Sequence, residues 1–362
     1  MTQIAAVQTY ASTHLPTQVE LALPVETRAR FSAHESVGFS LGRDFAAHGL
    51  TPPVEHLFAS SPLREGWQAG RSAFGRRTLR AKAQTRLWLM LRTHAWLRGR
   101  SFEDIQLTPL YLQQIEVSHC PITRTALSAE TRSIDRVRND AGYAAGNLVM
   151  MSSAANQAKA DLDFAAATER ALSVAHGPIQ SIAGLGPAEW QRVAILTSYV
   201  TELPHAVAAQ LPMTVLPPNR LRLFNPIQAL QALITRQLAV QGWSQRLARL
   251  EALLPGEALK ADFNRFLLAL APRVLALKEE DSAQQSRWAL EDAWTLPLVQ
   301  KRWAKFALQL DAQQAEDLVT RAARLQLATV HVQQHESQGA TEGWALERRG
   351  FCGPVSQATA WH

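Results

Sequence analysis

Apolar residues recur every three or four positions along most of the chain, the spacing of a helix that buries one face. Between 187 and 330, segments rich in Leu, Ala and Trp keep this spacing and are interrupted by prolines, which lack the backbone N–H that a helix interior needs. The interruptions fall at Pro204, Pro212, Pro217, Pro218, Pro255, Pro272 and Pro297. Roughly six to eight helices are predicted here, without a repeat of fixed length. The chain is therefore predicted to be mainly α, with a helical C-terminal domain.

Shorter elements are predicted upstream. An extended piece is expected around Gln18–Val25 and a short helix near Ser36–His48. A longer amphipathic helix is predicted from about Thr78 to Leu97, because Leu and Trp recur there at helical spacing. Ser101 has the features of a helix N-cap, with acids in the turn that follows. Thr108 precedes a proline that would occupy the first position of another short helix.

The helical pattern gives way between Ser133 and Leu162. Here the sequence predicts a short strand, a turn that contains glycine, a second short strand and a helix. Helix then continues to about Ala175, and the Gly and Pro residues of 176–187 mark a domain boundary. The predicted organisation is an N-terminal elaboration (1–65), a basic helix with a small α+β module (66–176), an all-helical domain (187–336) and an irregular tail (337–362).

Composition adds limits on compartment and partners. A chain of 362 residues with 47% hydrophobic content can bury sizeable cores. Cys120 and Cys352 lie far apart and neither belongs to a CxxC pair, so neither a disulfide framework nor structural zinc is expected. The N-terminus lacks the pattern of a signal peptide, and no window approaches about 18 uninterrupted apolar residues. We expect a cytoplasmic protein without a membrane partner.

The charge is unevenly distributed. The formal net charge is +6, yet Gly66 to Arg100 contains nine basic residues and no acidic one. Fixed cations displace the counterions condensed on nucleic acid, so a basic helix beside the small module would bind phosphates. The alternative is a solvated helix face, as charge runs often are. The candidates for nucleic-acid contact are Arg71, Arg76, Arg77, Arg80, Lys82 and Arg86.

The small module carries residues suited to a divalent cation. Asp135, on the first predicted strand, offers an anionic oxygen, and Asn156, on the helix, offers a neutral one. Such oxygens suit Mg²⁺ or Mn²⁺ and leave coordination positions for water and a phosphate oxygen. Lys159 lies about one turn beyond Asn156 on the same helix face, where it could meet a phosphate.

Several short pieces of this region resemble the ββα-metal finger of HNH endonucleases. The match is closer to a subgroup found in phage and bacterial proteins, in which the first strand carries S-(L/I)-D-R rather than D-H. It covers about Cys120 to Asp163 only. The matching pieces are Cys120-Pro121-Ile122-Thr123, Ser133-Ile134-Asp135-Arg136-Val137, Asn139-Asp140, Gly142-Tyr143, Gly146-Asn147-Leu148 and Ala155-Asn156-Gln157-Ala158-Lys159.

The resemblance implies a role for several residues. Asp135 aligns with the acid that helps to bind the metal, and Asn156 aligns with the last metal ligand of the motif. Asn147 aligns with the middle Asn, which braces the loop between the strands. Gly142 would supply backbone freedom to that loop. Zinc-bearing members also have two CxxC pairs, which this chain lacks, so structural zinc is not expected.

Arg136 departs from the wider superfamily, which has the general-base histidine at this place. An arginine stays protonated and cannot remove a proton from water, but it could hold a phosphate through two hydrogen bonds. His119 is the histidine nearest in sequence to the motif and is the alternative candidate for the base. A structural histidine at that position is the more ordinary interpretation.

Two functions follow as hypotheses. In the first, the protein is a metal-dependent DNA endonuclease that uses Mg²⁺ or Mn²⁺ for phosphodiester hydrolysis. In the second, the finger is a catalytically inactive scaffold that binds DNA or supports assembly, and the helical domain docks a protein partner. Arg136 motivates the second hypothesis because it replaces the base. DNA is the expected partner in the first hypothesis and in the DNA-binding form of the second.

Overall fold

The computed structural model describes residues 32–275, 283–327, 333–334 and 342–352. The predicted extended piece at Gln18–Val25 lies outside these residues. The strands β1 (Arg132–Arg136) and β2 (Leu148–Ser152) pair antiparallel, and the two-residue strands β3 (Arg222–Leu223) and β4 (Gln333–Gln334) pair parallel. The helices are α1 (Ala33–Ala47), α2 (Pro62–Phe74), α3 (Ala83–Leu97), α4 (Pro109–Gln114), α5 (Ser153–Lys159), α6 (Phe164–His176), α7 (Pro187–Ser198), α8 (His205–Ala208), α9 (Pro226–Gln237), α10 (Trp243–Glu251), α11 (Glu257–Leu275), α12 (Ala283–Ala293), α13 (Pro297–Ala307) and α14 (Ala312–Arg324).

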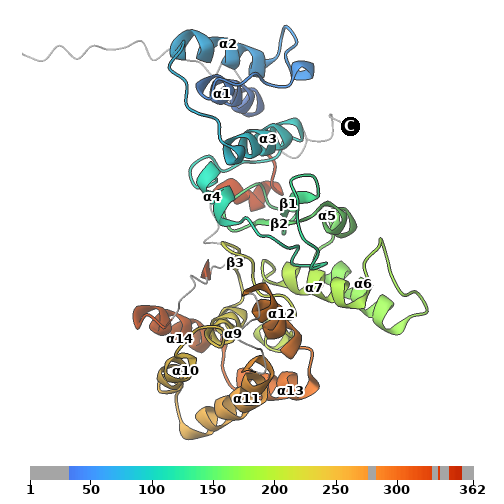
Figure 1. The fold of residues 1–362 in the computed structure, drawn as a ribbon, viewed down its shortest axis with the longest axis vertical. Helices are drawn as coiled ribbons and strands as arrows, with labels where there is room; N and C mark the ends of the chain where they lie inside the picture. Colours follow the sequence, from blue (N-terminus) through green and yellow to red (C-terminus); the bar gives the residue numbers. More distant parts are fainter. Residues whose placement is uncertain (1–31, 276–282, 328–332, 335–341, 353–362) are drawn as a thin grey trace, which may run out of the picture.

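The elements are stacked along one long axis (Figure 1). Helices α1 and α2 lie at one end, α3 and α4 follow, the unit β1–β2–α5 occupies the middle, and α9 to α14 form the other end. The prediction of a mainly helical fold with a small α+β module is confirmed at this level. No helix among the described residues is long and apolar enough to cross a membrane.

Glycines bring α1 and α2 into close contact. A Cβ on Gly42 would overlap the carbonyl oxygen of Leu63, and a Cβ on Gly66 would overlap that of Phe39. Each helix can approach the other only because these side chains are absent. Helix α2 also spans the expected boundary at residue 65, so α1 and α2 form one packed unit.

Helix α3 begins five residues later than the sequence predicts. It starts at Ala83 rather than Thr78, and the preceding connector runs beside α1, where the Leu79 N–H donates to the Ala47 carbonyl oxygen at 2.8 Å. The Leu79 side chain is exposed and therefore does not extend the buried face of the helix. The indoles of Trp88 and Trp96 are buried as predicted from their spacing.

The predicted helix start at Ser101 is wrong. The Ser101 N–H donates to the Gly350 carbonyl oxygen at 2.9 Å, and its own carbonyl oxygen accepts the Tyr143 N–H at 2.8 Å. Contacts between segments far apart in sequence thus override the local preference for a cap. The short helix after Thr108 forms as predicted, and the Thr108 hydroxyl accepts the Tyr111 N–H.

Part of the predicted irregular tail is docked. Residues 342–352 pack beside α3 and the β1–β2 hairpin, where the Cys352 N–H donates to the Gly99 carbonyl oxygen at 2.9 Å. The indole of Trp344 is fully buried and donates to the Ala145 carbonyl oxygen at 3.0 Å. The remaining residues of the predicted tail lie outside the described part of the chain.

Strand β2 belongs to two hydrophobic cores. Its side chains alternate between the two faces of the hairpin, as those of any strand do. Val149 and Met151 join the larger core, which continues into the C-terminal helices. Leu148 joins the smaller core built with α3 and α4, as does Ile134 from β1. The hairpin therefore links the two ends of the molecule, and the segments 66–176 and 187–336 share one core.

The described residues between 187 and 327 form eight helices, α7 to α14, within the predicted number. Their centre is aromatic: the rings of Trp294 and Trp303 meet edge to face at 5.5 Å, and Phe266 packs against both. Pro272 does not interrupt a helix as expected. It lies in the last turns of α11 and is exposed, where the missing N–H removes a single helical hydrogen bond.

Candidate functional site

The loop between β1 and β2 is held by the Asn147 side chain, which is fully buried. Its amide oxygen accepts the Arg138 N–H at 2.9 Å, and its amide nitrogen donates to the carbonyl oxygens of Arg138 and Gly142, each at 3.0 Å. A Cβ on Gly142 would overlap the carbonyl oxygen of Gly343 in the docked tail. The loop is therefore closed by its own amide and covered by the tail.

Asp135 is paired with Lys159 inside the β1–β2–α5 unit. The first turn of α5 is fixed by the Ser152 hydroxyl, which accepts the Ala155 N–H, and Lys159 is the last residue of this helix. The ammonium lies 3.0 Å from Asp135 Oδ2 and 3.2 Å from Oδ1, and it donates to the Arg136 carbonyl oxygen at 3.0 Å. The Lys159 side chain has no exposed surface. In this arrangement it cannot contact a phosphate at the surface, contrary to the role expected from its helix face.

Burial dominates the electrostatics of this carboxyl. Burial raises the pKa of Asp135, while the Lys159 ammonium acts in the opposite direction by stabilising the carboxylate. An isolated charge is strongly disfavoured at such a site, so the ammonium is the group that keeps the carboxylate compatible with the protein interior. The pair is a local neutral unit within the core.

Asn156 of α5 contacts the same face of β1 as Lys159 does, but it binds another residue of the strand. Its amide nitrogen donates to the Ser133 hydroxyl at 2.8 Å, and Ser133 precedes Asp135 by two residues on the strand. Helix α5 thus covers both strand residues, with Asn156 over the first and Lys159 over the second. The structure does not bring Asp135 and Asn156 to one open pocket.

The residues of this site do not fit the divalent cation that the sequence suggested. Asp135 Oδ1 accepts a hydrogen bond from the Lys159 ammonium, and Oδ2 lies 3.0 Å from the same ammonium but has no hydrogen-bond partner among the described residues. The side chain is almost completely buried. Among the described residues, no group of three or more His, Cys, Asp and Glu side chains could hold a metal ion. A magnesium or manganese ion would have to displace the Lys159 ammonium. Among the described residues, Lys159 forms an ion pair with no carboxylate other than that of Asp135.

Arg136 turns toward the loop. Its Nη1 donates to the carbonyl oxygens of Asn139 at 3.1 Å and Ala141 at 2.7 Å. Its guanidinium lies over the Tyr143 ring, 5.0 Å from the centroid. It therefore does not form the ion pair with Asp135 that would close a metal pocket; Lys159 takes that position.

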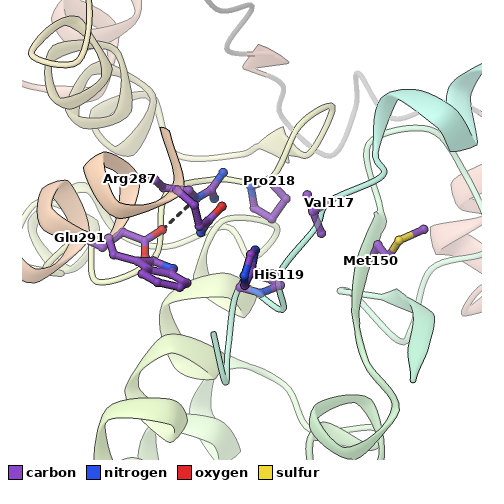
Figure 2. Close-up of a pocket in the computed structure, with 9 residues that line it drawn as sticks. Val117, His119, Met150, Pro218, Arg287 and Glu291 are labelled. Atoms are coloured by element: carbon purple, nitrogen blue, oxygen red, sulfur yellow. Dashed lines mark hydrogen bonds and ion pairs between the residues drawn. The ribbon is translucent and has the colours of Figure 1, made fainter. Parts of the chain in front are cut away.

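His119 points away from Asp135. Figure 2 shows it in a small pocket with Arg287 and Glu291 of α12, and its ring meets that of Trp288 edge to face at 5.4 Å. Met150 also lines this pocket, and it alternates along β2 with Val149, which is the partner of Asp135. Because neighbouring strand residues face opposite sides, His119 and Asp135 lie on different faces of the hairpin. His119 is not positioned as a base for chemistry at Asp135.

Charged residues also join the C-terminal helices to the segment before β1. Arg124 makes two contacts with the Asp292 carboxylate, at 2.6 and 2.9 Å, and a third with Glu291 at 3.3 Å. Glu291 is buried and accepts the Leu216 N–H and the Arg287 guanidinium. The sequence shows no sign of this network, because more than 160 residues separate Arg124 from its partners.

The six predicted nucleic-acid contacts outside the small module are all exposed. They come from the end of α2, from the connector and from the start of α3: Arg71, Arg76, Arg77, Arg80, Lys82 and Arg86. Within the part of the chain that the structure describes, none of them takes part in an ion pair. Arg92 differs, because it is buried and bound to Asp44 and Asp104.

Arg43, which the sequence pattern did not single out, adds to this basic region. It is exposed on α1 and lies over the Phe74 ring at 5.9 Å. Between 32 and 100 the chain has eleven Lys and Arg residues and four Asp and Glu residues, whereas the whole chain carries a net charge of only +6. The positive excess is therefore concentrated between residues 32 and 100, and four of its cations lie in the connector between α2 and α3.

Known proteins offer no direct guide to the role of these residues. Comparisons with protein-family models, with curated protein sequences and with solved structures each find no match. The chemistry of the site must therefore be inferred from the contacts of Asp135, Lys159 and the exposed basic residues themselves.

Proposed function

We propose that this protein binds nucleic acid through the basic region of α1, α2 and α3, and that its β1–β2–α5 unit is a non-catalytic scaffold that resembles the finger of HNH endonucleases. The observation that carries the proposal is the Asp135–Lys159 pair. A hydrolytic metal site needs a carboxylate that is open to the cation and to water. Here an ammonium occupies that position.

The exposed cations support the binding part of the proposal. A surface arginine that neutralises a backbone phosphate releases the cations condensed on the nucleic acid, and each contact of this kind makes the affinity salt-dependent. The six exposed cations Arg71, Arg76, Arg77, Arg80, Lys82 and Arg86 have no carboxylate partner among the described residues. Their charge is available to a polyanion, and DNA is the partner we propose.

The binding test compares two charge-matched triple variants by fluorescence anisotropy with a short labelled DNA duplex. Arg76→Gln/Arg77→Gln/Arg80→Gln removes three cations of the basic region. Lys301→Gln/Arg321→Gln/Arg324→Gln removes three exposed cations of the C-terminal helices. We expect the first variant to lose about tenfold or more in affinity at low salt, with a shallower salt dependence, and the second to bind as wild type does. Equal losses in both variants would refute a localised interface.

The scaffold part has its own test. Wild-type protein and the Asp135→Asn variant are incubated with supercoiled plasmid in Mg²⁺ and in Mn²⁺. We expect no nicking by either protein and equal DNA affinity, because Asp135 is buried against Lys159. Metal-dependent nicking by the wild type that disappears in Asp135→Asn would establish the nuclease hypothesis instead. That hypothesis is kept as the second candidate because an acid on β1 and an amide on α5 are both present.

A further inference from the structure

Two guanidinium groups converge on a single carbonyl oxygen near the start of the β1–β2 loop. Nη1 of Arg136 lies 3.1 Å from the Asn139 oxygen, and Nη1 of Arg100 lies 3.5 Å from the same atom. Arg100 also donates to the Arg349 carbonyl oxygen at 2.9 Å. Backbone oxygens from the loop and from the tail therefore hold two like charges close together.

Neither guanidinium has a carboxylate partner among the residues that the structure describes. The nearby acid, Asp140, is already bound by Arg138 through two contacts at 2.8 and 3.2 Å. Burial and the proximity of Arg136 lower the pKa of Arg100 to about 10. Two crowded cations without a counter-charge are unfavourable, and an anion between them would relieve both the repulsion and the loss of hydration.

Aromatic rings fix the two groups in position. Arg100 lies over the Phe351 ring, 3.9 Å from its centroid, and Arg136 lies over Tyr143 at 5.0 Å. The contacts above use only Nη1 of each group. The other guanidinium nitrogens of Arg100 and Arg136 are not among the buried polar atoms of the described residues that lack a hydrogen-bond partner. Each side chain therefore keeps N–H groups for an external acceptor, in the planar arrangement that suits phosphate oxygens.

We propose that Arg100 and Arg136 together bind one phosphate group near the start of the loop, beside the Asn139 carbonyl oxygen. This rests on the proposed nucleic-acid binding for its biological ligand, which is either a backbone phosphodiester or a terminal phosphate of a nucleic acid. The site brings together residues from α3's C-terminal side, from β1 and from the docked tail. It differs from the exposed cations of α2 and α3 because its two groups are half-buried and preorganised.

The first experiment uses inorganic phosphate alone, so that it does not depend on nucleic-acid binding. Phosphate affinity is measured by isothermal titration for wild type, Arg100→Gln and Arg98→Gln at constant ionic strength. Arg98 is an exposed neighbour that makes no contact with Asn139. Losing a charge-assisted hydrogen bond should weaken phosphate binding about tenfold or more in Arg100→Gln, and Arg98→Gln should change it little. Equal affinities in the three proteins, or no phosphate binding by wild type, would overturn the proposal.

A second variant keeps the test valid if Arg100→Gln does not fold. Arg100→Lys retains the charge but loses the planar fork, so we expect a several-fold loss of phosphate affinity in a folded protein. The paired site would also be contradicted if Arg100→Lys and Arg136→Lys both fold and both bind phosphate as tightly as wild type does.

Oligonucleotides then distinguish the two sources of phosphate. The same single strand is compared with a 5′-phosphate and with a 5′-hydroxyl end. Tighter binding of the phosphorylated strand, lost in Arg100→Gln, would assign a terminal phosphate. Equal binding of the two strands that weakens in Arg100→Gln would assign a backbone phosphodiester. If no strand binds but phosphate does, the Arg100–Arg136 site stands and the proposed nucleic-acid function fails.

Discussion

The connector before α3 and the cluster around Asp262 in the C-terminal helices differ in how their positive charges are paired. In the basic region, exposed arginines of α2 and the connector have no ion pair among the described residues. At the other end, Lys305 and Arg265 both bind the Asp262 carboxylate, at 2.9 and 2.7 Å. The difference lies in where the carboxylates are, because cations are exposed in both regions. Cations with acidic partners stabilise the fold locally, whereas cations without them remain available to an external anion.

Within the N-terminal half, the buried cations have acidic partners, unlike the exposed cations of the basic region. Arg92 and Lys159 are the buried cations of that half that the structure pairs with acids, Arg92 with Asp44 and Asp104 and Lys159 with Asp135. An unpaired charge is tolerated at the surface and not in the core. The cations without partners in the basic region therefore lie at the surface, whereas the Asp135–Lys159 pair lies in the protein interior.

The largest expected effect comes from breaking the interior pair. Lys159→Met keeps the side-chain length but leaves the Asp135 carboxylate buried without a cation, and we expect a loss of about 3–5 kcal/mol in the free energy of unfolding at neutral pH. The measurement is urea denaturation. The loss should shrink toward acid pH, because burial already raises the pKa of Asp135 and protonation removes the charge.

Two controls decide the cause of that loss. The double variant Asp135→Leu/Lys159→Met removes both charges and should recover much of the stability. Lys260→Met at the other end removes the partly buried partner of the exposed Glu257 and should have little effect. A double variant as unstable as Lys159→Met would show that lost packing, rather than an unpaired carboxylate, causes the change.

An intermediate effect is expected where α1 meets α2, beneath the basic surface. Gly42→Ala would force a methyl group against the Leu63 carbonyl oxygen, and overpacking of this kind costs on the order of 1–3 kcal/mol. Thermal unfolding measures the loss. Ser40→Ala, at an exposed position of the same helix, is the matched control and should be nearly neutral. Equal stability of the two variants would mean that the helices can separate without penalty.

Local patterns in the sequence predicted the helices well, because helical spacing and proline positions are properties of short segments. Trp88 and Trp96 on α3, and the proline at the start of α4, follow from neighbours within a few residues. The helix start predicted at Ser101 was wrong because non-local contacts decide the conformation there. The partners of Ser101, Tyr143 and Gly350, are distant in sequence, and their pairing outweighs a cap worth about 1 kcal/mol.

The candidate site was harder to predict than the fold. The sequence placed Asp135 on a strand and both Asn156 and Lys159 on the following helix, and the structure has them there. Whether a lysine reaches into the core or out to solvent depends on packing from both hydrophobic cores, which no local pattern encodes. The partner of Asp135 therefore required the three-dimensional structure.

The smallest expected effect tests the paired cations at the far end. Hydrogen bonds from Lys305, Arg265 and Gln309 lower the pKa of Asp262 to about 2, from its ordinary value of 3.8. A depressed carboxyl pKa adds stability that is complete above the unfolded-state value and is lost as the pH falls through the folded-state value. Asp262→Asn should therefore lower the melting temperature at pH values above about 5, and the difference from wild type should narrow as the pH approaches 2.

The control for this profile is Asp161→Asn, which removes an exposed acid that has no ion pair in the described part of the chain. Its melting temperature should follow that of wild type across the same pH range. A difference between Asp262→Asn and wild type that stays constant down to pH 2 would mean that Asp262 contributes shape rather than charge. The charge of Asp262 would then no longer explain why Arg265 and Lys305 bind it. The contrast between the two regions would rest on the exposed arginines of the basic region alone.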